Sequence, residues 1–128
     1  MKLLLDTHAF LWVLVDDAGL SATVRREIMI PENEVLVSVA SLWEISIKYG
    51  LGRLPLPQEP DRYLPAKREA AGIGLLTIDE AEVCQIHRLP PLHRDPFDRL
   101  LIAQANCYGL VIATNDPVIG RYPVRTIW

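Results

Sequence analysis

Short apolar runs alternate with helical stretches along this chain of 128 residues, and this alternation most constrains its fold. The runs at residues 2–5, 35–39 and 110–113 are rich in aliphatic and β-branched side chains, as buried parallel strands are. A strand, a crossing helix and a second strand together form the unit of a parallel sheet. The pattern therefore predicts an α/β fold with three layers, α/β/α, in which helices cover both faces of a central, mainly parallel sheet.

Two of these apolar runs are followed closely by an acid. Asp6 comes directly after residues 2–5, and Asp116 closes the Thr114-Asn115-Asp116 segment after residues 110–113. The carboxyl ends of parallel strands share one edge of a sheet, and open α/β sheets bind their ligands there. We therefore expect both carboxylates at that edge.

Two further acids lie in predicted helices. Asp95 is a good N-cap and Pro96 suits the first helical position, so Asp98 falls in the first turn of a helix at residues 95–105. Helix capping and dipole complementation by themselves explain Asp95 and Asp98. Glu44 lies between two apolar stripes of a helix at residues 40–49, where it either faces a polar pocket or pairs with Lys48 four residues on.

The other expected elements are less distinctive. A helix at residues 79–87 would turn Ala81, Cys84 and Val83 inward. Pro65 would bend or shorten a helix at residues 60–71. Cys84 and Cys107 lie far apart without metal-binding spacing, which predicts reduced core thiols. We expect helices at residues 9–15, 21–29, 60–71 and 79–87 and strands at residues 72–78 and 124–128.

Composition excludes several classes of protein. The length predicts one domain over residues 1–128, and a hydrophobic content of 50% is typical of a globular chain. No apolar run approaches the ~20 residues that span a bilayer, so we expect a cytoplasmic protein without a membrane partner. A net charge of −3 gives no general attraction to nucleic acid. Binding of RNA or DNA would therefore need a local basic patch or a bound cation.

Asp6, Glu44, Asp98 and Asp116 are the candidate catalytic and metal-binding residues. Carboxylates about 4 Å apart repel by roughly 4 kcal/mol per pair at an effective dielectric constant near 20, so such a cluster needs protons or cations. Oxygen ligands without clustered Cys or His suit Mg²⁺ or Mn²⁺ and argue against structural zinc. The chemistry indicated is hydrolysis of a phosphate ester by a metal-activated water, because no pair of nucleophile and base is evident.

The order of these motifs is similar to that of the PIN-domain ribonucleases. The segments that carry the resemblance are residues 3–8, 38–45, 95–105 and 114–116, and together they cover essentially the whole chain. The compact form resembles the VapC-type toxins. The resemblance implies a PIN-like fold and a Mg²⁺-dependent endoribonuclease that forms a homodimer. It also implies a small antitoxin that covers the active site, with operator DNA bound only through that antitoxin.

Carried over residue by residue, the resemblance makes Asp6 and Asp98 the leading metal ligands. Glu44 and Asp116 complete the acidic pocket, directly or through water. Three further residues are supporting candidates, Asp95 as a fifth acid and two threonines that orient carboxylates or water: Asp95, Thr7 and Thr114.

Three cations near the acids are candidate phosphate contacts, although an ordinary solvated or paired side chain is the favoured explanation of each: Arg94, Arg99 and Lys48. For His8 and His93 we favour packing or hydrogen bonding over contact with substrate. Trp12, Trp43 and Leu51 are candidates for an apolar groove that receives a partner helix, or else for the core.

Three other functions fit less well. A phosphatase with an aspartyl nucleophile at Asp6 needs an acid where His8 stands, and a dinucleotide-binding domain needs a glycine-rich loop after the first strand. The remaining alternative is a non-catalytic PIN-like domain that binds RNA or serves as a scaffold. Loss of one or more acids would mark that class, and none of the four is missing.

Overall fold

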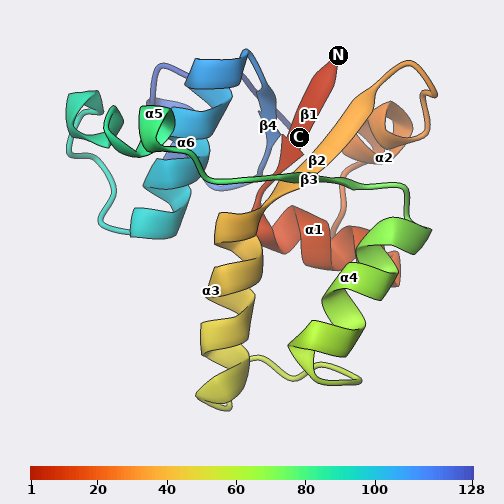
Figure 1. The fold of residues 1–128 in the computed structure, drawn as a ribbon. Coiled ribbons are helices and arrows are strands. Elements are labelled where there is room, and N and C mark those ends of the chain that lie inside the picture. The colour runs from red at the N-terminus through yellow and green to blue at the C-terminus, as the bar shows by residue number, and fades with distance from the viewer.

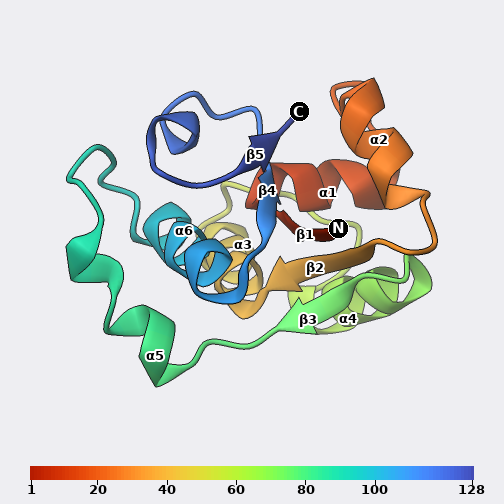
Figure 2. The same ribbon diagram turned by 90° about the horizontal axis from the view of Figure 1, so that it is seen from above.

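Five short strands form one sheet in the order β3-β2-β1-β4-β5, and every pairing is parallel. The structure is a computed structural model that describes residues 1–128. Figures 1 and 2 show the sheet between helices on its two faces, which confirms the predicted α/β/α arrangement. The elements are β1 (Lys2–Leu5), α1 (Thr7–Val15), α2 (Ala22–Ile28), β2 (Glu34–Ser38), α3 (Val39–Gly50), α4 (Pro60–Ala70), β3 (Gly74–Leu76), α5 (Glu80–Val83), η1 (Ile86–Arg88), α6 (Pro96–Tyr108), β4 (Val111–Ala113), η2 (Ile119–Arg121) and β5 (Thr126–Ile127).

The central strand β1 is buried on both faces because its successive side chains enter opposite cores. Leu3 and Leu5 pack in one core with Phe10 of α1, whereas Leu4 packs in the other core with Leu101 of α6. All three leucines of β1 have no exposed surface. This explains why the strand is a continuous apolar run rather than an alternating one.

Strand β1 lies in the middle of the sheet, and the later strands are added first on one side of it and then on the other. From β1 the chain proceeds outward to β2 and β3, and it then crosses to the other side of β1 to form β4 and β5. In Figure 2, α1 and α6 lie on opposite faces of the sheet. The connection that leaves β1 and the connection that enters β4 therefore lie on opposite faces, and open α/β sheets have a crevice at the carboxyl ends of the strands at such a point.

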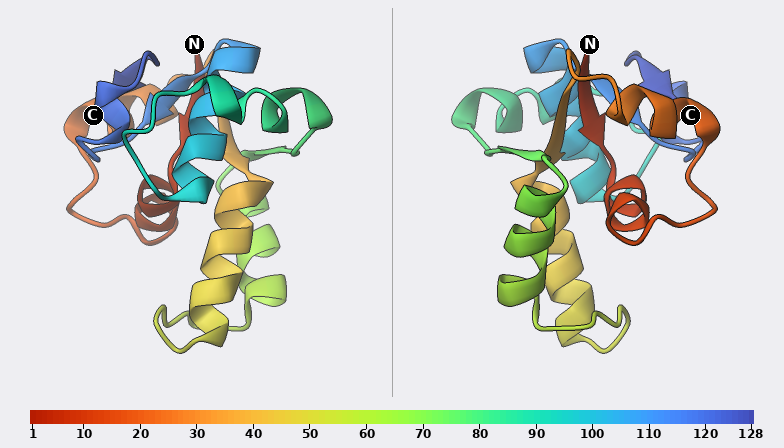
Figure 3. Two further views of the ribbon diagram at one scale, coloured as in Figure 1. Left: turned by 90° about the vertical axis from the view of Figure 1, so that its left-hand side faces the viewer. Right: turned by 90° about the vertical axis from the view of Figure 1, so that its right-hand side faces the viewer.

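Helix α3 brings a second element to the same edge. It begins directly after β2 and extends beyond the sheet, with α4 beside it (Figures 1 and 3). Ser38 caps α3 by accepting a hydrogen bond from the Ala40 backbone N–H at 3.0 Å. Helix α4 continues through Pro65 to Ala70, so the proline does not shorten it. No helix is both long enough and apolar enough to cross a membrane.

The segment between β3 and α6 differs from the prediction. The strand expected at residues 72–78 is only Gly74–Leu76, and the helix expected at residues 79–87 is divided into α5 and η1. Ala81, Val83 and Cys84 are exposed, so their predicted inward orientation is wrong. Both cysteines are free, but Cys107 is only half-buried and neither thiol belongs to the core.

A polar residue takes the inward position of α5 instead. Glu82 has no exposed surface and accepts hydrogen bonds from the Tyr108 hydroxyl at 3.1 Å and from the Gln104 amide at 3.4 Å. The prediction failed because α5 docks on a polar patch of α6. A hydrophobic pattern read along four residues cannot reveal the surface on which they pack.

Candidate active site

The four predicted acids lie in one pocket at the carboxyl edge of the sheet. Asp6 follows β1, Asp116 follows β4, Asp98 lies in the first turn of α6 and Glu44 lies in α3. None of the residues that line the pocket is hydrophobic. The lining residues are Asp6, Thr7, His8, Glu44, Lys48, His93, Asp95, Asp98, Asn115 and Asp116.

Asp6 is held by the first turn of α1. One of its carboxylate oxygens, Oδ1, accepts a hydrogen bond from the Ala9 backbone N–H at 2.8 Å, and the residue is only 5% exposed. Burial raises the pKa of Asp6, while a hydrogen bond with the Thr114 side chain opposes that rise. Thr114 Oγ1 also accepts from the Asp116 backbone N–H at 3.0 Å. Thr114 thus connects the two acids that follow neighbouring strands.

Glu44 both faces the polar pocket and pairs with Lys48, so the two alternatives for this residue hold together. The side chain is buried in the pocket, and Lys48 Nζ donates to its Oε2 at 2.7 Å from the next turn of α3. Thr7 Oγ1 donates to the other oxygen, Oε1, at 2.7 Å, and the Ser41 hydroxyl lies 3.1 Å from the same Thr7 atom. The hydrogen bond to Glu44 raises the pKa of Lys48. The Glu44 carboxylate is therefore held at both oxygens, and the ammonium group of Lys48 balances its charge.

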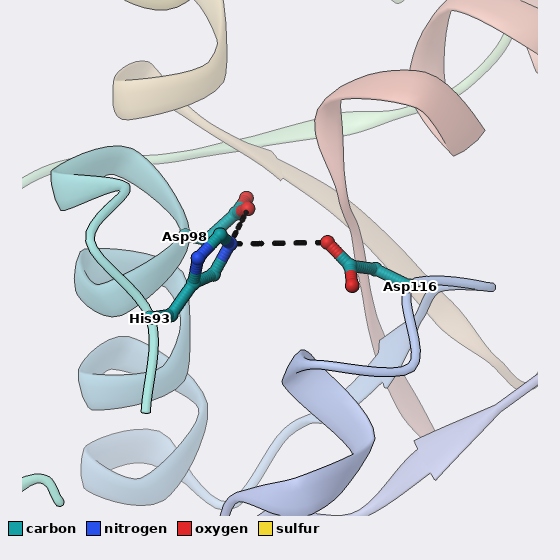
Figure 4. A group of neighbouring side chains, drawn as sticks. All are labelled: His93, Asp98 and Asp116. Carbon is teal, nitrogen blue, oxygen red and sulfur yellow. Dashed lines mark hydrogen bonds and ion pairs between the residues drawn. The ribbon is translucent and has the colours of Figure 1, made fainter. Parts of the chain in front are cut away.

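Asp98, His93 and Asp116 form a group of possible metal ligands in the pocket (Figure 4). His93 Nε2 lies 2.8 Å from Asp98 Oδ2 and 3.8 Å from Asp116 Oδ2. Burial, with the negative charge of Asp95 nearby, raises the pKa of Asp98 to about 6. The turn after β4 fixes Asp116, whose Oδ1 accepts from the Val118 backbone N–H at 2.8 Å.

Asp95 has the capping role that the sequence indicated. Its Oδ1 accepts hydrogen bonds from the backbone N–H groups of Phe97 at 2.9 Å and Asp98 at 3.3 Å, at the start of α6. The residue also lines the pocket and adds negative charge beside Asp98. Asp95 therefore both caps α6 and contributes negative charge to the pocket.

The three candidate phosphate contacts have different positions. Lys48 lines the pocket, whereas Arg94 is exposed and Arg99 is half-buried, and neither arginine lines it. The Arg99 guanidinium donates to the backbone carbonyls of Pro90 at 3.0 Å and Ile86 at 3.2 Å, and to the Tyr122 hydroxyl at 3.1 Å. Its hydrogen-bonding groups therefore hold the loop between η1 and α6, and a contact of Arg99 or Arg94 with phosphate stays a prediction.

His93 is the site residue that sequence reasoning undervalued. It lies on an irregular loop five residues before Asp98, and only the path of that loop directs its ring toward the two acids. No periodic pattern specifies the direction of a side chain in such a segment. His8 also lines the pocket, and its ring lies beside Trp12 with a centroid separation of 6.2 Å.

The donor atoms in the pocket fit a divalent cation. One ligand atom each from His93, Asp98 and Asp116 can be chosen so that all three lie within 4.8 Å of one another. Asp6 adds a carboxylate from the same pocket. Carboxylate oxygens with one imidazole nitrogen suit Mn²⁺ and other first-row ions, and carboxylates alone suit Mg²⁺. A bound cation would also relieve the repulsion among the acids.

The chain is similar to known proteins in sequence and in fold. The family model described as PIN domain matches residues 3–124. A 49-residue segment is 43% identical to Ribonuclease VapC16 of Mycobacterium tuberculosis, and this match covers 38% of the chain and 35% of that relative. The chain therefore spans about a third of the length of the curated relative that it matches.

Solved structures with the same fold match over almost the whole chain. VapBC2 from Rickettsia felis, bound to a DNA fragment from its promoter, has a TM-score of 0.73 at 15% identity and covers 99% of this chain and 98% of that one. DNA-bound VapBC from Salmonella typhimurium has a TM-score of 0.67 at 21% identity, with 99% and 97% covered. At these identities the similarity establishes the fold.

Proposed function

The chain belongs to the PIN-domain family, and on that premise we propose that it is a metal-dependent endoribonuclease, the VapC-type toxin of a toxin–antitoxin pair. The convergence of four acids from four separate elements in an entirely polar pocket carries this proposal. Repulsion among these carboxylates lowers the stability of the folded protein when no cation is bound. A cluster that lowers stability is expected where the acids have a function. We take residues 1–128 as a single PIN domain.

The residues of the pocket have separate roles in this proposal. Asp98 and Asp116, with Asp6, hold Mg²⁺ or Mn²⁺, which when bound supplies an activated water and neutralises charge on the phosphodiester. Glu44 completes the acidic pocket and fixes the ammonium group of Lys48, which is positioned to contact a phosphate oxygen. Thr7 and Thr114 orient the carboxylates with which they hydrogen-bond.

We also infer a protein partner, because the solved relatives are VapBC complexes. An apolar groove between α1 and the segment before α4 is suited to a hydrophobic segment of an antitoxin. Its apolar walls include Leu11, Trp12, Leu54, Leu56 and Tyr63. With a net charge of −3, the chain would contact operator DNA only through that antitoxin.

A homodimer is the second assembly that we propose. Trp43 and Ile47 of α3 and the C-cap residue Leu51 follow one another at intervals of four residues, so they lie along one face of the helix. They are 56%, 41% and 61% exposed. A two-fold axis would pack this face against its copy. Trp12 of α1 differs from these residues, because it is half-buried and packs against the core.

RNA cleavage by the purified protein tests the function. We expect cleavage of single-stranded RNA with Mg²⁺ or Mn²⁺, no cleavage with a chelator, and no cleavage by folded Asp6→Asn or Asp98→Asn variants. Asp61→Asn is the matched control, since Asp61 is an exposed acid in α4 outside the pocket. Equal cleavage by all variants would exclude this site.

The alternative function is a non-catalytic domain that binds RNA or serves as a scaffold. It predicts that RNA binds without being cleaved at any metal concentration. Cleavage that depends on Asp98 excludes this alternative. Binding without cleavage under every condition would favour it over the nuclease.

A further inference from the structure

The ring of His93 lies against Asp98 and directs one nitrogen toward Asp116, and these three side chains form a group that could hold a metal ion. Figure 4 shows its nitrogen directed at both acids, with Nε2 2.8 Å from Asp98 Oδ2 and 3.8 Å from Asp116 Oδ2. Ligand atoms about 2.1 Å from one ion in an octahedral arrangement are roughly 3 Å apart when adjacent and roughly 4 Å apart when opposite. The two distances from His93 Nε2 are therefore close to those between ligands of one ion.

The protein holds this ring in place through its backbone. The N–H groups of Leu92 and His93 both donate to the Tyr122 hydroxyl, at 3.2 Å and 2.8 Å. Arg99 donates to the same hydroxyl and to the Pro90 carbonyl. Tyr122 is only 4% exposed, so a buried anchor fixes the loop at the residue that reaches the pocket. The side chain of His93 is 22% exposed and has little freedom to leave.

An imidazole changes which ion the pocket prefers. Mg²⁺ binds oxygen ligands and retains several waters, whereas imidazole nitrogen is a good ligand for first-row transition metals. Oxygen ligands alone would leave little preference between Mg²⁺ and Mn²⁺. A nitrogen donor shifts the preference toward Mn²⁺.

We propose that His93 is a direct metal ligand with Asp98 and Asp116, and that the pocket therefore binds Mn²⁺ in preference to Mg²⁺. This inference deepens the proposed function, because it concerns the same metal site. It assigns to His93 a role in coordination, rather than only in hydrogen bonding to a carboxylate that binds the ion through its other oxygen.

Metal binding without RNA tests the proposal independently of cleavage. Mn²⁺ bound to the whole protein would be observed by electron paramagnetic resonance, with pulsed measurements that detect coupling to ¹⁴N. We expect imidazole nitrogen coupling in the wild-type protein and its loss in His93→Asn. Competition with Mg²⁺ should show a preference for Mn²⁺ that falls at least about tenfold in this variant.

His87→Asn is the matched control. His87 is exposed in η1, where its Nδ1 lies 2.9 Å from the Cys84 carbonyl, and it does not line the pocket. This variant should retain both the nitrogen coupling and the preference for Mn²⁺. A circular dichroism melt of each variant checks that it is folded.

The outcomes separate this inference from the proposed function. Mn²⁺ that binds without nitrogen coupling, with metal-dependent cleavage intact, overturns the role of His93 and leaves the nuclease in place. Coupling that persists in His93→Asn assigns the nitrogen to another residue and also overturns it. Absence of Mn²⁺ and Mg²⁺ binding at millimolar concentration contradicts both proposals.

Discussion

Asp98 is the residue whose pKa shows most clearly that the pocket disfavours a negative charge. Its pKa is raised from 3.8 to about 6, first by burial and then by the charge of Asp95. Between these two values the folded protein binds more protons at this carboxyl than the unfolded chain does. The free energy of unfolding therefore falls as pH rises through this interval, and the full cost is present above pH 6.

Asp98→Asn should therefore stabilise the metal-free protein at neutral pH. We expect its free energy of unfolding to rise by about 1–3 kcal/mol at pH 7.5 and to change little at about pH 3, because that pH lies below both pKa values of Asp98 and the carboxyl is then mostly neutral in both states. Chemical denaturation in the presence of a chelator at the two pH values measures the effect. The control variant Asp61→Asn should have nearly the same free energy of unfolding as the wild type at both pH values. A variant less stable than the wild type at pH 7.5 would contradict this interpretation.

Glu44 illustrates why one position can satisfy a structural and a functional explanation together. Lys48 and Thr7 occupy its two oxygens, so the carboxylate is paired within the protein and is also part of the pocket. The sequence left these alternatives open because the spacing of Glu44 and Lys48 is a property of any helix. The contact with Thr7 depends on α1 and α3 meeting at the sheet edge.

At the scale of elements, the start of α6 and the loop before it form one unit. Asp95 caps the helix, and Arg99 in its second turn holds the preceding loop through two carbonyls and the Tyr122 hydroxyl. The guanidinium can reach three acceptors because its donors are arranged as a fixed fork. This anchoring connects α6 with the position of His93.

Arg99→Lys should loosen this loop, because one ammonium group cannot reproduce the three contacts. We expect faster amide hydrogen exchange at residues 86–93 and a loss of about 1–3 kcal/mol in the free energy of unfolding. Hydrogen exchange followed by mass spectrometry makes the first measurement. Arg62→Lys, in exposed surface on α4, is the control and should leave the loop unchanged. Unaltered exchange in Arg99→Lys would argue against the anchor.

At the scale of the whole molecule, the order of the strands around β1 determines where the site lies. Because β1 and β4 are neighbours and their connections lie on opposite faces of the sheet, Asp6 and Asp116 meet in a crevice that neither strand could form alone. Helix α3 extends from the same edge, so its exposed apolar face lies beside the pocket. Trp43 contacts Phe97 of α6 there, with a ring separation of 5.1 Å.

Ile47→Glu should weaken self-association through this face. A charge at the centre of an apolar contact loses its hydration without gaining a partner, so we expect the dissociation constant of the dimer to rise by about tenfold or more. Analytical ultracentrifugation over a concentration series measures this change. Met29→Glu is the control, because Met29 is 76% exposed on α2, away from α3. A wild-type protein that is monomeric at all concentrations would exclude the proposed dimer.

Local patterns of the sequence were enough to predict the parallel sheet, its covering helices and the position of Asp6 and Asp116 at one edge, since strands, helix caps and the acids beside them are encoded within a few residues. The addition of Glu44 and Asp98 to the same pocket rested on the family resemblance. Packing between distant segments sets the rest, namely that His93 faces the acids, that Arg99 holds a loop and that Glu82 rather than Cys84 faces inward. Each of these depends on where two segments distant in the chain meet, and hydrophobic periodicity carries no information about the surface on which an irregular segment or a single helical turn will pack.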